Sequence, residues 1–141
     1  MISGMDWKLE VVVLPVTDVD RAVDFYVGRL GWTLDTDHRP NETFRVVQVT
    51  PPGSACSVVF GNGLGGDGGP VSGTQLVVSD IEQALAHLDA AAVETSGLQH
   101  FVDGGMTPGP DPERREFGTF IFFSDPDGNS CAVQEGKRPA A

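Results

Sequence analysis

The heptapeptide VTDVDRA at residues 16–22 recurs as VSDIEQA at residues 78–84. A second pair of similar stretches is TPPGSACSVV at 50–59 and DPDGNSCAVQ at 125–134. The second pair is spaced more widely along the chain than the first, so the second half carries an insertion, which falls within 95–118. This self-similarity predicts two copies of one structural unit.

The first half reads as one strand, one helix and three more strands. Residues 9–16 form a β-branched run that predicts a strand. Apolar residues then recur at helical spacing up to Leu30, with Thr17 as the expected N-cap and Gly31 as the stop signal. Further strands are expected at residues 32–35, 44–49 and 56–60.

The second half repeats this order. A strand is expected at residues 74–78, and Ser79 with Glu82 forms a capping box at the start of the following helix. The last strands are expected at 120–123 and 131–135. The predicted fold class is therefore α+β, built from a βαβββ unit used twice. We expect one domain over residues 1–141, with repeat one at 7–60, a linker at 61–72 and repeat two at 73–136.

Composition restricts the classes of partner. The 141 residues carry 20 Asp and Glu against 9 Lys and Arg, for a formal net charge of −11. This balance argues against nucleic acid, whose phosphates are neutralised by Lys and Arg, and against an anionic membrane surface. No apolar run reaches membrane-spanning length, and no signal peptide is expected. With only two cysteines, a cytoplasmic protein with reduced thiols is expected.

Two stretches resemble a known family. VTDVDRAVDFY at 16–26 with LGW at 30–32 resembles the opening of the vicinal oxygen chelate superfamily, and FSDPDGN at 123–129 resembles its closing signature. That superfamily includes glyoxalase I, bleomycin-resistance proteins, fosfomycin-resistance enzymes, methylmalonyl-CoA epimerase and extradiol dioxygenases. The resemblance implies two modules whose mixed sheets curl around a shared cleft, in a glyoxalase-like fold that is commonly completed as a homodimer.

The resemblance also implies where a metal would be held. Enzymes of the superfamily bind one divalent metal through a residue on the first and last strand of each half, and these positions correspond here to Val11, Ser57, Gly73 and Ala132. None is a histidine or a carboxylate. Glu10 and Glu135 are an odd number of residues away and are expected on the opposite sheet face. We therefore expect no metal and no cofactor.

The residues expected to face the cleft suit an organic ligand. They combine apolar side chains with hydroxyl and amide groups: Val11, Val13, Ser57, Val59, Gln75 and Gln134. Residues 97–117 have no counterpart in the first repeat, and we expect them to lack strand and helix and to form a mobile lid. That lid would add His100, Phe101 and Arg114. The alternatives are a loop histidine, local ion pairs for Arg114, and an excursion packed on a dimer partner.

The leading functional hypothesis is metal-independent binding of a small, largely apolar organic molecule by a homodimer, in the manner of bleomycin-resistance proteins. The alternative is an enzyme of the superfamily, a lyase or isomerase of unassigned substrate. A third possibility is a regulatory or structural dimer whose cleft has lost its ligand. No nucleic acid or membrane partner is expected.

Overall fold

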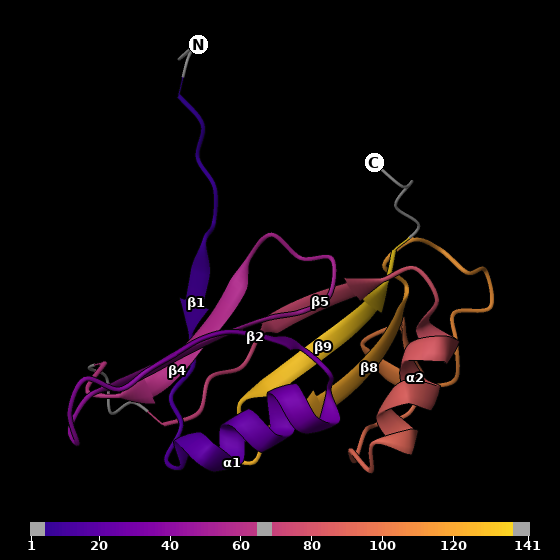
Figure 1. Ribbon diagram of the computed structural model, residues 1–141. Coiled ribbons are helices and arrows are strands. Elements are labelled where there is room, and N and C mark those ends of the chain that lie inside the picture. The colour runs from indigo at the N-terminus through magenta and orange to yellow at the C-terminus, as the bar shows by residue number, and fades with distance from the viewer. Residues whose placement is uncertain (1–4, 65–68, 137–141) are drawn as a thin grey trace. The chain divides into compact units, whose positions relative to one another are not determined.

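The computed structural model describes residues 5–64 and 69–136 (Figure 1). The chain divides into two compact units, residues 1–68 (unit 1) and 69–141 (unit 2). The division falls inside the expected linker at 61–72, of which residues 65–68 lie outside the described residues. The two units are described separately.

Unit 1 contains a mixed four-stranded sheet. Its elements are β1 (Val11–Val13), α1 (Val19–Val23), a π-helical continuation η1 (Asp24–Arg29), β2 (Thr33–His38), β3 (Arg45–Thr50) and β4 (Ser57–Asn62). The strand order is β1-β4-β3-β2, with β1 parallel to β4 and the other neighbours antiparallel. The last strand therefore continues beyond the predicted end, into the stretch expected to be linker.

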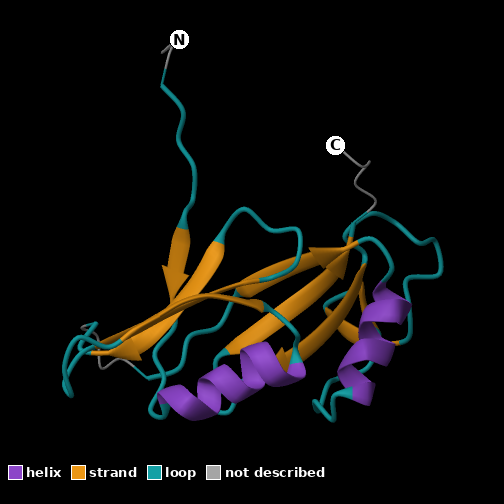
Figure 2. Cartoon of the chain, viewed as in Figure 1, coloured by secondary structure: helices purple, strands orange, loops and turns teal. Residues whose placement is uncertain are grey.

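Unit 2 repeats this arrangement and adds one edge strand. Its elements are β5 (Thr74–Val78), α2 (Ile81–Ala90), β6 (Gln99–Val102), β7 (Gly105–Pro108), β8 (Thr119–Ser124) and β9 (Ser130–Glu135). Figure 2 shows strands in orange and helices in purple. The order β5-β9-β8-β6-β7 matches that of unit 1 except for β7, and β5 is parallel to β9. The predicted α+β class with paired βαβββ units is confirmed, as two mixed sheets that do not close into barrels.

The helix caps lie one position later than predicted. Asp18, not Thr17, accepts a hydrogen bond from the Arg21 amide at 3.1 Å. Asp80, not Ser79, does the same for Gln83 at 3.1 Å. The extended backbone of each aspartate directs its carboxylate at the first free amides of its helix. The two caps occupy the same position within the two repeated heptapeptides, so the repeat itself is preserved.

The expectation that residues 97–117 lack regular structure is wrong. Strands β6 and β7 form a hairpin that pairs with β8. Asp103 and Gly104 make the two-residue connection, and Gly104 has a φ of +90°, which glycine adopts without strain. The Asp-Gly pair is a strong hairpin signal, and the sequence contains it at this point.

Each sheet has one face covered by its own helix. In unit 1, Arg45 bonds Asp20 of α1 at 2.8 Å, and the ring centroids of Tyr26 and Phe60 lie 5.6 Å apart. In unit 2, the Glu135 carboxylate accepts a hydrogen bond from the Ile81 amide of α2 at 3.2 Å. Because side chains alternate along a strand, the neighbours of these residues lie on the opposite face of each sheet. We call that opposite face the second face of each unit.

The described helices are short: α2 has ten residues, and α1 with its continuation η1 has five and six. Both fall far short of the roughly 20 residues that cross a bilayer, and no described helix meets the requirements of a membrane span.

Candidate functional site

The second face of unit 2 carries a pair of parallel aromatic rings. Phe120 and Phe122 lie two positions apart on β8, with ring centroids separated by 5.9 Å and ring planes within 4° of one another. Both rings are half-buried. Phe101 on the neighbouring strand β6 lies on the same face and is 59% exposed. Together these side chains form an apolar, aromatic surface of the kind that receives a planar ring.

Two amides lie beside the aromatic surface. The register places Gln134 opposite Phe120, and Gln75 opposite Ala132. The Gln134 side-chain amide donates a hydrogen bond to the Gln75 side-chain carbonyl, with 2.6 Å between nitrogen and oxygen. Each side-chain amide has both donors and an acceptor, so one mutual bond leaves donor and acceptor capacity for a ligand. These are the polar groups that the sequence predicted on this face.

The second face of unit 1 carries the four predicted residues of that half. Val11 pairs with Ser57, and Val13 with Val59, across the parallel β1–β4 ladder. Ser57 is buried, and its hydroxyl lies 2.6 Å from the hydroxyl of Thr50 on β3. On this face the aliphatic side chains of β1 and β4 therefore lie beside a pair of hydroxyl groups.

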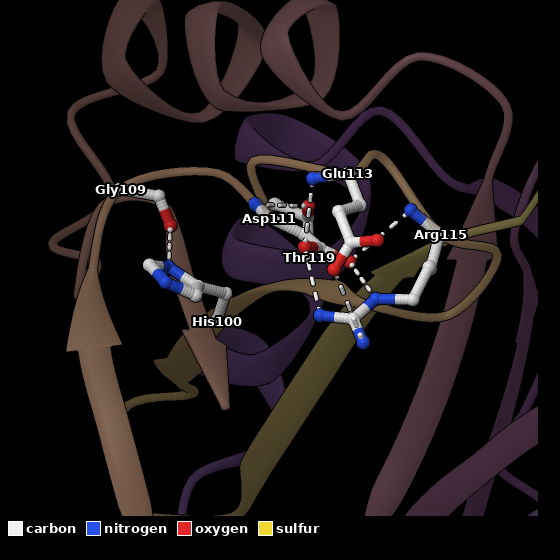
Figure 3. Close-up of polar contacts among 6 residues, drawn as sticks. All are labelled: His100, Gly109, Asp111, Glu113, Arg115 and Thr119. Atoms are coloured by element: carbon white, nitrogen blue, oxygen red, sulfur yellow. Dashed lines mark hydrogen bonds and ion pairs between the residues drawn. The ribbon is translucent and has the colours of Figure 1, made fainter. Parts of the chain in front are cut away.

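Two of the predicted residues lie on the helix side instead. In the strand register His100 pairs with Thr119, which is fully buried on the α2 side of the sheet. The Nδ1 atom of the His100 ring is hydrogen-bonded to the Gly109 carbonyl at 2.8 Å (Figure 3). Arg114 bonds Glu82 of α2 and lies 3.7 Å from Glu135. Within unit 2, these two side chains therefore lie on the face opposite Gln75, Gln134 and Phe101.

The loop after β7 is organised by Asp111, which the motif analysis did not single out. The Asp111 carboxylate is buried and accepts hydrogen bonds from the Glu113 and Arg115 amides and from the Arg115 guanidinium at 2.9 and 3.1 Å (Figure 3). The hydrogen bonds from Arg115 hold the pKa of Asp111 well below its usual range. The Pro-Asp-Pro stretch at 110–112 is a turn signal that could have revealed this anchor.

One group of carboxylates has the geometry of a cation site. Oxygen atoms of Asp80, Glu82 and Glu135 lie within 4.8 Å of one another. The guanidinium of Arg114 bonds Glu82 and approaches Glu135, so the chain supplies its own cation to this group. The cluster belongs to the junction between α2 and the 111–118 loop.

The register corrects one of the metal positions expected from the family resemblance. Ala132 in unit 2 corresponds to Ser57 in unit 1, and their strand partners are Gln75 and Val11. The position on the first strand of unit 2 is therefore Gln75 and not Gly73, which precedes β5. The shift arises because the connection from the first strand to the helix cap is two positions shorter in unit 2 than in unit 1. It is an even shift, so the side chain still lies on the same face.

The sequence matches one family model. The model of the Glyoxalase/Bleomycin resistance protein/Dioxygenase superfamily matches residues 8–133. Among curated proteins, none matches this sequence.

Solved structures of the same superfamily resemble the chain. A glyoxalase/bleomycin resistance protein from Streptomyces sp. CB03234 has 29% identity and a TM-score of 0.69, covering 91% of this chain and 100% of its own. TnmS3, an antibiotic binding protein from Streptomyces sp. CB03234, has 27% identity and a TM-score of 0.69, covering 96% and 99%. A superfamily member from Sphaerobacter thermophilus DSM 20745 has 28% identity and a TM-score of 0.69, covering 92% and 98%.

Proposed function

Because the chain belongs to the Glyoxalase/Bleomycin resistance protein/Dioxygenase superfamily, we propose that it binds a small, largely apolar organic molecule without a metal ion. The observation that carries the proposal is the stacked Phe120–Phe122 pair beside the Gln75–Gln134 amide pair. Aromatic rings supply apolar contact area and stacking, and a few amides fix orientation, which is the usual make-up of a small-molecule site. The likeness to TnmS3, which is named an antibiotic binding protein, supports the same class of ligand.

The donor set does not fit the metal of the superfamily's enzymes. The four corresponding positions hold Val11, Ser57, Gln75 and Ala132. A catalytic zinc site needs about three protein ligands drawn from His, Cys and carboxylates, and these four side chains offer none. The proposed function therefore involves binding of the organic molecule by these side chains and no metal-dependent reaction.

After dialysis, elemental analysis of the purified protein is expected to give far less than one divalent metal ion per chain, because these four side chains bind such ions weakly. A zinc protein dialysed in parallel controls for metal lost by handling. A ratio near one that falls when Ser57 and Gln75 are both replaced by alanine would restore the enzyme hypothesis.

Removing an aromatic ring from the second face of unit 2 is expected to weaken ligand binding. For a neutral planar probe such as 2-methoxynaphthalene, Phe122→Ala and Phe101→Ala should each raise the dissociation constant about tenfold, since each loses stacking and buried apolar area. Titration followed by NMR gives the constants. Val102→Ala is the matched control, because Val102 is an exposed neighbour of Phe101 on the opposite sheet face. Equal effects of all three variants would refute the proposed surface.

We also propose a homodimer, which the segment before β1 supports. Met5, Trp7 and Leu9 alternate with polar residues and are 57%, 85% and 70% exposed. A row of apolar side chains on one side of an extended segment is unfavourable in water and suits burial against a second copy.

Sedimentation at micromolar concentration is expected to show a dimer. The double variant Trp7→Ser/Leu9→Ser should raise the dimer dissociation constant at least about tenfold through lost apolar burial. Lys8→Ser, on the alternate side of the segment, should leave it unchanged. A wild-type monomer at tens of micromolar would contradict the proposal.

A further inference from the structure

We propose that Ser57 is a hydrogen-bond acceptor for the ligand, and that Thr50 and Asp35 fix this polarity. The inference rests on the proposed function and goes beyond it, because it specifies a chemical group on the ligand. A planar apolar ligand on the second face of unit 1 would be selected for carrying an O–H or N–H donor.

The three side chains form a continuous chain of hydrogen bonds across three strands. Thr50 on β3 donates to the Asp35 carboxylate on β2, and its hydroxyl lies 2.6 Å from that of Ser57 on β4. A break in the β2–β3 register between Leu34 and Thr36 leaves Asp35 without a strand partner. This bulge is what allows its carboxylate to reach Thr50.

The directions of the protons follow from counting donors. An ionised carboxylate only accepts, and a hydroxyl has one proton to donate. Thr50 therefore gives its proton to Asp35. The short contact between Thr50 and Ser57 requires a proton between the two oxygens, so it must be the proton of Ser57. The Ser57 oxygen is left with lone pairs and no further proton to donate.

This fixed polarity distinguishes Ser57 from the amides of unit 2. Gln75 and Gln134 retain both donors and acceptors and accommodate either kind of ligand group. Ser57 is only 5% exposed and lies between Val11 of β1 and Thr50 of β3. In such an environment an acceptor group of the ligand would face another acceptor with little water to separate them, whereas a donor would complete the chain.

The test compares two probes that differ in one donor proton, 2-naphthol and 2-methoxynaphthalene. Dissociation constants come from NMR titration that follows the methyl groups of Val11 and Val59, which lie on the same face as Ser57. The wild-type protein is expected to prefer 2-naphthol about fivefold, the net effect of one hydrogen bond. Ser57→Ala should remove the preference.

Thr50→Val provides the sharper variant. Valine cannot accept the proton of Ser57, so the Ser57 hydroxyl becomes free to donate to the ligand. The preference for 2-naphthol should then disappear or reverse. Thr33→Val is the matched control, because Thr33 also pairs with Thr50 in the strand register but is not part of the hydrogen-bonded chain.

The outcomes separate the two proposals. Equal affinity for both probes in the wild type, or an unchanged preference in Thr50→Val, would overturn the role of Ser57 and leave the proposed function standing. Probes that bind the aromatic surface of unit 2 but leave the Val11 and Val59 signals unchanged would likewise overturn this inference alone. Failure of both probes to bind either unit would overturn the proposed function, and this inference with it. A preference that disappears in Ser57→Ala and Thr50→Val but persists in Thr33→Val would support the inference.

Discussion

The Gly61→Ala variant is expected to lose about 3 kcal/mol of unfolding free energy, near the upper end of the cost of overpacking a close-packed interior. A Cβ atom at position 61 would lie 1.9 Å from the Arg45 carbonyl oxygen and 2.8 Å from its carbon. Both are backbone atoms of β3, the strand paired with β4 at this point. Neither can rotate away, so the two strands would have to separate locally.

Urea unfolding followed by circular dichroism measures this loss. Gly28→Ala is the control, because Gly28 lies in η1 and a Cβ there meets nothing within 4 Å. That change is expected to be neutral or to stabilise slightly, since alanine favours a helix. Equal unfolding midpoints for the two variants would contradict the predicted clash.

The Asp111→Asn variant is expected to lower the midpoint of thermal unfolding by about 5–10 °C at pH 7, the usual scale for a broken buried network in a small domain. The carboxylate is 1% exposed and receives four hydrogen bonds from the 113–115 turn. An asparagine would direct its NH₂ group at the Arg115 guanidinium or at backbone amides, where donors face donors.

The effect of Asp111 should depend on pH in a defined direction. The hydrogen bonds from Arg115 lower the pKa of Asp111 in the folded state, whereas an unfolded aspartate titrates at about 3.9. A lowered pKa stabilises the folded state above the unfolded value, and the benefit is lost as pH falls. The difference between wild type and Asp111→Asn should therefore be complete at pH 7 and shrink below about pH 4.

Calorimetry across this pH range provides the measurement, and Asp103→Asn, an exposed aspartate of the β6–β7 turn, is the control. A difference between wild type and Asp111→Asn that stays constant down to pH 2 would show that the charge of Asp111 is not responsible.

The sequence by itself determined the duplicated unit and the faces of its strands. The repeat of VTDVDRA as VSDIEQA identified two equivalent strand–helix junctions. The family resemblance implied that Val11 and Ser57 face the cleft, and alternation along each strand extended that face to residues such as Gln75 and Gln134, which the structure places opposite the helices. These properties are local, because the period of two in a strand does not depend on distant residues.

The tertiary structure decided the pairings between segments far apart in sequence. Strand register identified Gln75 as the counterpart of Val11, because the connection to the helix differs in length between the units. The β6–β7 hairpin turned the 99–108 segment into sheet, placing Phe101 on the second face and His100 on the other. The Asp35–Thr50–Ser57 chain required a bulge on β2 to meet hydroxyls from β3 and β4. Such contacts join residues on three strands, and only the folded sheet brings their side chains within hydrogen-bonding distance.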